Sequence, residues 1–155
     1  MKAETLMTSP VCTCSEDDSL EQAARIMWES DVGCVVVIDE QEHPVGMLTD
    51  RDALMAAYTQ GVPLRAARVS SAMSREPLKC SSDMHLKEIE QAMQSAQIRR
   101  VPVVNSDGKL VGIVGLGDIA RSSQDLPLHV TEVPGVAKTL ACVTQPRSRE
   151  VAAAE

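Results

Sequence analysis

A threonine and an aspartate three residues apart, Thr49 and Asp52, form the polar pair with the clearest chemical potential in the sequence. They follow Gly46, which lies in a short apolar run. At the start of a helix, the Asp52 carboxylate can accept hydrogen bonds from ribose hydroxyls, while the Thr49 hydroxyl and the helix N-terminus favour a phosphate. The same spacing is that of a capping box, in which both side chains satisfy backbone amides. The pattern is compatible with both roles.

Two adjacent arginines, Arg99 and Arg100, stand directly before an apolar run that begins with Val101 and Pro102. Guanidinium groups bind phosphate through charged hydrogen bonds. A capping role cannot explain the two arginines, although a solvated surface pair can, because arginines are common on protein surfaces. They are therefore the first candidates for contacts with a phosphate.

The sequence contains no arrangement typical of an enzyme. No nucleophile is paired with a base, and the phosphate-binding loop G-x-x-x-x-G-K-[ST] is absent. The three histidines, His43, His85 and His129, are isolated from one another. We therefore predict no catalytic residue.

The five cysteines occur at spacings that match no zinc-binding motif. Cys12 and Cys14 are the one pair that is close in sequence, and no histidine cluster accompanies them. In a reducing cytosol such residues are mostly small buried hydrophobes. We expect reduced, structural thiols and no bound metal.

Composition limits the partners of the chain. Of its 155 residues, 44% are hydrophobic and 24% are charged, as in an ordinary globular protein. A net charge of -7 and an aromatic content of 1% argue against nucleic-acid binding, which usually needs a basic face or rings that stack on bases. No apolar run approaches the roughly 20 residues that span a bilayer, and the N-terminus lacks the apolar stretch of a signal peptide. We expect a cytoplasmic protein without a membrane partner.

The chain contains two copies of one unit, which align when the sequence is shifted by 66 residues. Over residues 7–52 this shift makes 11 of 46 positions identical. The identical pairs are Met7/Met73, Cys14/Cys80, Ser15/Ser81, Asp17/Asp83, Leu20/Leu86, Met27/Met93, Val35/Val101, Val37/Val103, Val45/Val111, Gly46/Gly112 and Asp52/Asp118. A duplicated supersecondary unit is therefore predicted.

Both copies predict the same order of elements. In the first copy a helix is expected after Asp17 or Asp18 as its cap, with Leu20 and Met27 on one face. The continuous apolar run at 34–38 predicts a buried strand. The remaining predicted elements are a strand at 45–48 and a helix at 50–60 in the first copy, and a helix at 84–96, strands at 101–105 and 110–114 and a helix at 116–122 in the second.

Two segments carry a family resemblance, VGMLTDRD at 45–52 and RRVPVV at 99–104. Together with the duplication, they resemble the tandem CBS domain pair, or Bateman module, over about residues 5–124. Stand-alone bacterial CBS domain-containing proteins are the most similar type. The resemblance implies an α/β (α+β) fold in which two β-α-β-β-α repeats pack about a pseudo-twofold axis.

The resemblance also implies a domain organisation. The expected parts are CBS repeat 1 at 5–62, a linker at 63–72, CBS repeat 2 at 73–124 and a C-terminal extension at 125–155. We expect the extension to be partly disordered, with a short helix within 129–144 that Pro134 interrupts.

In many members of the CBS family, clefts between the two repeats hold AMP, ATP or S-adenosylmethionine. Gly46, Thr49 and Asp52 match the family's ribose and phosphate motif, Gly-h-x-Thr/Ser-x-x-Asp, in which h is apolar. Arg99 and Arg100 resemble the cations that reach the phosphate of the nucleotide whose ribose the other repeat holds. Val101, Pro102 and Asp118 complete the expected nucleotide-binding residues.

The second cleft departs from the family pattern. Gly115 takes the place of the threonine, and Gly33 and Cys34 take the place of the cations. Asp118 remains for a ribose, and the run at 35–37 offers an apolar wall for an adenine. A nucleotide is therefore expected to prefer the cleft of Thr49, Asp52 and the two arginines.

The resemblance implies a regulatory, ligand-sensing module that needs no cofactor and acts on an unknown client protein. A nucleotide-free scaffold with vestigial clefts is the alternative, because anionic ligands must overcome a net charge of -7. We also expect a homodimer, because the helix at 50–60 carries more apolar surface than its own repeat needs and its counterpart carries Leu116, Ile119 and Ala120.

Overall fold

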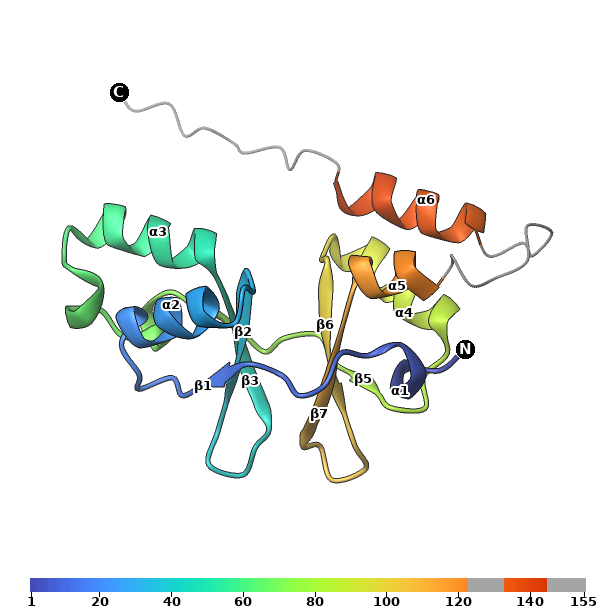
Figure 1. Cartoon of the computed structure of the whole chain (residues 1–155), viewed down its shortest axis with the longest axis horizontal. Coiled ribbons are helices and arrows are strands. Elements are labelled where there is room, and N and C mark those ends of the chain that lie inside the picture. Colours follow the sequence, from blue (N-terminus) through green and yellow to red (C-terminus); the bar gives the residue numbers. More distant parts are fainter. Residues whose placement is uncertain (123–132, 145–155) are drawn as a thin grey trace.

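The computed structural model describes residues 1–122 and 133–144, which contain two similar α/β units side by side (Figure 1). The first unit, repeat 1, consists of β1 (Thr13–Cys14), α2 (Leu20–Glu29), β2 (Cys34–Ile38), β3 (Pro44–Thr49) and α3 (Asp50–Gln60). The second, repeat 2, consists of β5 (Cys80–Ser81), α4 (Leu86–Ala96), β6 (Arg100–Val104), β7 (Leu110–Gly115) and α5 (Leu116–Ser122). The predicted order β-α-β-β-α is confirmed in both copies.

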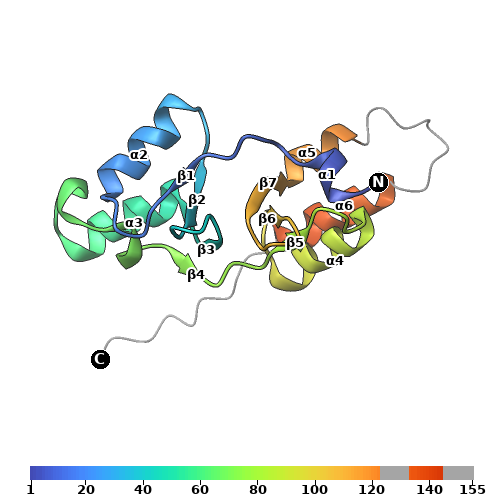
Figure 2. The same ribbon diagram turned by 90° about the horizontal axis from the view of Figure 1, so that it is seen from below.

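Each repeat has its own small sheet. Strand order is β1-β2-β3-β4 in repeat 1, with β4 at Ser74–Arg75, and β5-β6-β7 in repeat 2. In both sheets the first pair is parallel and the second is antiparallel. Val35, Val36 and Val37 of β2 are all fully buried, as predicted for a continuous apolar run, because helices cover one face and repeat 2 lies beside the other (Figures 1 and 2).

Local capping sets where the helices begin. The Ser19 hydroxyl accepts a hydrogen bond from the amide of Gln22 and caps α2, so the predicted cap at Asp17 or Asp18 is wrong. Helix α4 starts at Leu86, two residues later than predicted, because the Glu88 carboxylate accepts from the amide of His85 just before it. At its other end, α3 stops at Gly61, which adopts φ 64° as a left-handed cap.

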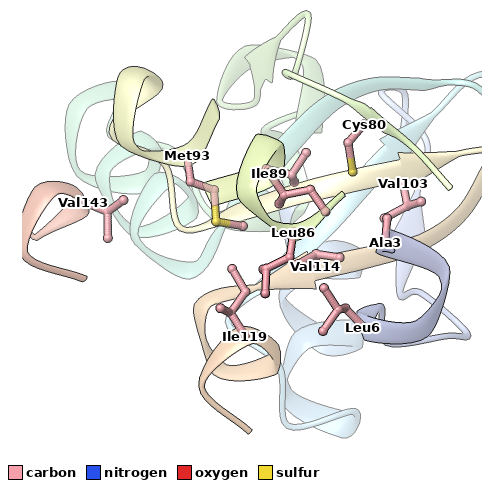
Figure 3. Close-up of a cluster of buried hydrophobic side chains, with 11 residues drawn as sticks. Ala3, Leu6, Cys80, Leu86, Ile89, Met93, Val103, Val114, Ile119 and Val143 are labelled. Atoms are coloured by element: carbon pink, nitrogen blue, oxygen red, sulfur yellow. The ribbon is translucent and has the colours of Figure 1, made fainter. Parts of the chain in front are cut away.

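The segment before each repeat packs on the other repeat. Helix α1 (Ala3–Leu6) lies on repeat 2, where Ala3 and Leu6 join its hydrophobic core (Figure 3). The segment between the repeats, with 3-10 turns at Leu64–Ala66 and Val69–Ser71, returns to the core of repeat 1. This exchange interlocks the two repeats.

Two methionines in these crossing segments rest on two glycines. A Cβ on Gly46 would lie 2.7 Å from the Met73 sulfur, and a Cβ on Gly112 would lie 2.2 Å from the Met7 sulfur. The identical pairs Met7/Met73 and Gly46/Gly112 are thus the two halves of one repeated contact. Gly46 is needed there for close packing whether or not a ligand binds.

One further helix, α6 (Val133–Val143), follows the repeats. It packs against α4 and α5, and Val143 joins the core of repeat 2 (Figures 1 and 3). Pro134 lies in the first turn, where its missing amide hydrogen has no intrahelical partner to lose, so it does not interrupt the helix as predicted. The segments 123–132 and 145–155, which include the part expected to be disordered, lie outside the described residues.

None of the helices within 1–122 and 133–144 is long and apolar enough to cross a membrane.

Candidate functional site

A cavity of about 640 Å³ lies between the two repeats. Repeat 1 and the N-terminal segment supply one wall, and the start of β6 and the turn from β7 into α5 supply the other. The lining residues are Thr8, Pro10, Val11, Cys12, Asp31, Val32, Gly33, Cys34, Asp50, Arg99, Arg100, Ile113, Gly115, Leu116, Gly117, Asp118 and Arg121. Its volume is in the range of small-molecule sites.

Arg99 and Arg100 stand at this cavity with exposed side chains. The Arg100 stem passes Gly115, and its guanidinium reaches toward repeat 1, with Nη2 3.9 Å from where a Cβ on Gly33 would lie. Within the described part of the chain, neither guanidinium forms an ion pair with a carboxylate. Both are therefore available to an anion.

Asp118 is an acidic residue in the repeat 2 wall of the cavity. Its Oδ2 accepts a hydrogen bond from the Gly115 amide at 2.7 Å, which caps α5. Its Oδ1 accepts from the Thr8 hydroxyl at 2.9 Å and from the Arg121 guanidinium. The carboxylate is thus held in place by three donors, and two of these come from side chains that a ligand hydroxyl can replace.

Thr49 and Asp52 do not line this cavity. They form a complete capping box, because Asp52 Oδ2 accepts from the Thr49 amide at 2.9 Å and the Asp52 amide donates to the Thr49 hydroxyl at 3.2 Å. The Thr49 hydroxyl also donates to Asp52 Oδ2 at 2.7 Å. The motif therefore has the helix-capping role that its spacing allows.

The sequence predicted that Arg99 and Arg100 share a cleft with Thr49 and Asp52. In the structure, neither Thr49 nor Asp52 lines the cavity of the two arginines. The arginines share the cavity with Asp118, so the expectation that the Asp118 cleft lacks cations is wrong. Strand pairing explains this arrangement, because Arg100 lies opposite Gly115 in the antiparallel pair β6/β7. The arginines thus adjoin the cap of their own repeat.

The apolar residues predicted at the site lie elsewhere. Val101 is fully buried in the core of repeat 2, and Pro102 is buried in β6 opposite Ile113. Neither lines the cavity, and Gly46 packs against Met73. The apolar lining comes instead from Val11, Ile113 and neighbouring residues.

Four charged or polar lining residues were missed by sequence reasoning: Thr8, Asp31, Asp50 and Arg121. Of these four, only Arg121 could have been found from the sequence, because it follows the predicted site residue Asp118 by one helical turn. The cavity holds three arginines and three aspartates, so its formal charges balance. A ligand of low net charge suits this balance better than a polyanion.

Three of the five cysteines, Cys14, Cys34 and Cys80, are buried. Cys14 and Cys80 lie in separate cores, and burial raises the pKa of Cys14 to about 12 and that of Cys80 to about 11. Burial also raises the pKa of Cys34 at the cavity wall, against the opposing effect of the nearby Arg100 charge. Among the described residues, no group of three or more His, Cys, Asp or Glu side chains is placed to hold a metal ion.

Two interlocked β-α-β-β-α repeats around a charged cavity define a two-repeat binding module. The CBS domain family model matches residues 3–58 and 69–125, so the chain belongs to the CBS domain family. CBS domain-containing protein YhcV of Bacillus subtilis is 40% identical over 114 residues, which are 74% of this chain and 79% of YhcV.

Two solved structures with the same fold contain bound groups. The structure of Hypoxic Response Protein I with two coordinated zinc ions has a TM-score of 0.72 and 31% identity, and the match covers 82% of this chain and all of that one. The structure of CBSX2 in complex with AMP has a TM-score of 0.69 and 26% identity, and the match covers 79% of this chain and 96% of that one.

Proposed function

We propose that this chain is a regulatory module that binds an adenine nucleotide in the cavity between its two CBS repeats. The observation that carries the proposal is the meeting of Arg99, Arg100 and Asp118 at one cavity. The AMP complex of the related CBSX2 supports the choice of an adenylate.

Different lining residues contact different parts of the ligand. Arg99 and Arg100 donate charged hydrogen bonds to the phosphate. Asp118 accepts from the ribose hydroxyls once they replace the Thr8 hydroxyl or the Arg121 guanidinium. The apolar lining near Val11 packs against the adenine. Because the cavity charges balance, AMP and S-adenosylmethionine suit it better than ATP.

A nucleotide-free scaffold is the second candidate. It is favoured by one observation, namely that Asp52 and Asp118 both already cap their own helices. A homodimer through the CBS helices and a client protein belong to either candidate.

Calorimetric titration with AMP, ATP and S-adenosylmethionine tests the proposal. Replacing both arginines, Arg99→Ala with Arg100→Ala, is expected to weaken AMP binding by roughly ten to a hundredfold or more, since charged hydrogen bonds contribute about 1.5 to 3 kcal/mol each. The matched control is Arg25→Ala, an exposed arginine on α2 away from the cavity, which should leave binding unchanged. If the native chain binds none of the three ligands, the scaffold is the correct function.

A further inference from the structure

Two of the donors that hold Asp118 are not part of its helix cap. Asp118 Oδ1 accepts a hydrogen bond from the Thr8 hydroxyl at 2.9 Å, and it forms an ion pair with the Arg121 guanidinium. The cap itself is made by the Gly115 amide, which donates to the other oxygen, Oδ2. The side chain of Asp118 is 12% exposed and that of Arg121 is 69% exposed. A shielded carboxylate is thus paired with a cation on a long side chain that solvent reaches.

The corresponding carboxylate of repeat 1, Asp52, has neutral partners from its own turn. The Thr49 amide and the Thr49 hydroxyl both donate to Asp52 Oδ2. A shift of 66 residues places Met55 of repeat 1 where repeat 2 has Arg121. The charged donor on a flexible side chain is therefore a feature of Asp118 and not of the repeated motif.

The backbone of α5 makes room for this cation. A Cβ on Gly117 would lie 3.3 Å from Arg121 Nη1, which is closer than ordinary van der Waals contact. Repeat 1 has Arg51 at the position that matches Gly117. The Arg121 side chain therefore points back along α5, over a position without a side chain, and ends at Asp118.

Replacing Arg121 at Asp118 is unfavourable for a ligand that offers only hydroxyl groups. A ribose hydroxyl gives the carboxylate a hydrogen bond from a neutral donor in place of one from a cation, and hydrogen bonds between two charged groups are the stronger ones. The same exchange leaves the guanidinium without its anion. A nucleoside without a phosphate must therefore compete with a stronger resident partner.

A ligand that also carries a phosphate compensates for this loss. Arg121 lines the same cavity as Arg99 and Arg100, so a phosphate bound by these two residues is a new anion for the released guanidinium. The planar guanidinium group matches phosphate as well as carboxylate. The ribose hydroxyls thus release the cation that the phosphate then binds, and the two parts of the ligand assist each other.

We propose that Arg121 is a specificity-determining residue that exchanges Asp118 for the phosphate of the ligand, so that the cavity selects ribosides that carry a phosphate over the corresponding nucleosides. This inference rests on the proposed function and names the ligand class of that site. In the empty cavity Arg121 occupies the hydrogen-bonding position of a ribose hydroxyl. In the complex it is the third cation at the phosphate.

AMP and adenosine test the proposal, because they differ only in the phosphate. Both are titrated calorimetrically into the native chain and into Arg121→Ala. The substitution removes the charged competitor for Asp118, so adenosine should bind roughly tenfold or more tightly to the variant than to the native chain. The affinity for AMP should change far less, because AMP loses a competitor and a cation at once. Affinities for the two ligands that change by the same factor overturn the proposal, since a purely structural role of Arg121 affects both alike.

Two further variants separate competition from charge. Thr8→Val removes the other donor to Asp118 Oδ1 without removing a charge, so the affinities for AMP and adenosine should change by the same factor. Arg65→Ala, an exposed arginine outside the cavity, is the control and should leave both affinities unchanged. Because Arg121 is largely exposed, circular dichroism should show an unchanged fold in Arg121→Ala.

The titrations also distinguish this inference from the proposed function. If AMP binds to the native chain and the ratio of the AMP and adenosine affinities is the same in Arg121→Ala, only the role of Arg121 is wrong. If the native chain does not bind AMP, the proposed function is wrong and the role of Arg121 is overturned with it.

Discussion

Repeat 1 and repeat 2 share one fold but differ at two corresponding places. Arg99 and Arg100 stand at the start of β6, whereas Gly33 and Cys34 stand at the matching positions at the start of β2. On the helical side, repeat 2 is covered by α6, and repeat 1 exposes Trp28. The two arginines and the ribose-binding candidate Asp118 thus belong to repeat 2, while the exposed Trp28 belongs to repeat 1. The two copies share the fold and differ in the side chains that they present.

This division does not make the repeats independent. Met7 precedes repeat 1 in the sequence but packs on Gly112 of repeat 2, and Met73 precedes repeat 2 but packs on Gly46 of repeat 1. Each core is therefore completed by chain that leads into the other copy. A destabilising substitution in one repeat should therefore lower the stability of both repeats, and the following variants test this.

The largest effect is expected from emptying equivalent core positions. Leu20→Ala and Leu86→Ala each remove a buried side chain from one core, and each should lower the free energy of unfolding by about 2 to 5 kcal/mol. Because the crossing segments interlock the repeats, chemical unfolding should remain a single transition in both variants. Separate transitions of the two repeats in urea would contradict the interlocked account.

A smaller loss is expected where the crossing segments touch the sheets. Gly46→Ala and Gly112→Ala introduce a Cβ closer than 3.0 Å to a methionine sulfur, so each should cost about 1 to 3 kcal/mol of unfolding free energy in urea titrations. Adding Met7→Ala should restore part of the loss in Gly112→Ala but none in Gly46→Ala. Rescue of both glycine variants by Met7→Ala would disprove the two separate contacts.

Substitutions at the helix caps should produce a smaller difference in stability between the repeats. Thr49→Ala removes the capping box of α3 and should lower the unfolding free energy by about 1 kcal/mol, measured by thermal or urea unfolding. The matching position in repeat 2 is Gly115, which has no side chain to cap the helix. Gly115→Ala should therefore lower the unfolding free energy by less than Thr49→Ala does. A larger loss at Gly115 than at Thr49 would reverse this comparison.

The smallest effect concerns the contact between two hairpin turns, the β2–β3 turn of repeat 1 and the β6–β7 turn of repeat 2. The Lys109 ammonium donates to Glu42 at 2.8 Å and holds the pKa of that carboxyl below its usual value. The contribution of this pair is present above the unfolded carboxyl pKa of about 4.3 and is lost as pH falls through the lower folded pKa. Glu42→Gln should therefore reduce the loss of stability between about pH 5 and pH 3, seen in unfolding midpoints. An unchanged pH dependence of stability in this variant would show that the Lys109–Glu42 pair does not contribute to it.

The sequence predicted the repeated architecture well, because the apolar run at 34–38 and the helical spacing of Leu20 and Met27 are local patterns. It did not predict which repeat each leading segment covers, because identity of Met7 with Met73 does not show that the two contacts cross. The placement of Arg100 beside Gly115 depends on strand register, which the spacing of the motif Thr49-x-x-Asp52 does not contain. The cover by α6 depends on Thr139, which lies outside both repeats.

The most direct test of the candidate site compares the two aspartates that the shift of 66 residues aligns. AMP is titrated into the native chain, Asp118→Asn and Asp52→Asn, with asparagine chosen because its amide oxygen can still accept from the cap amide. We predict roughly tenfold or greater weakening of AMP binding for Asp118→Asn and little change for Asp52→Asn, because of these two aspartates only Asp118 shares the cavity with Arg99 and Arg100. Equal weakening by both substitutions, or a larger effect at Asp52, would contradict it.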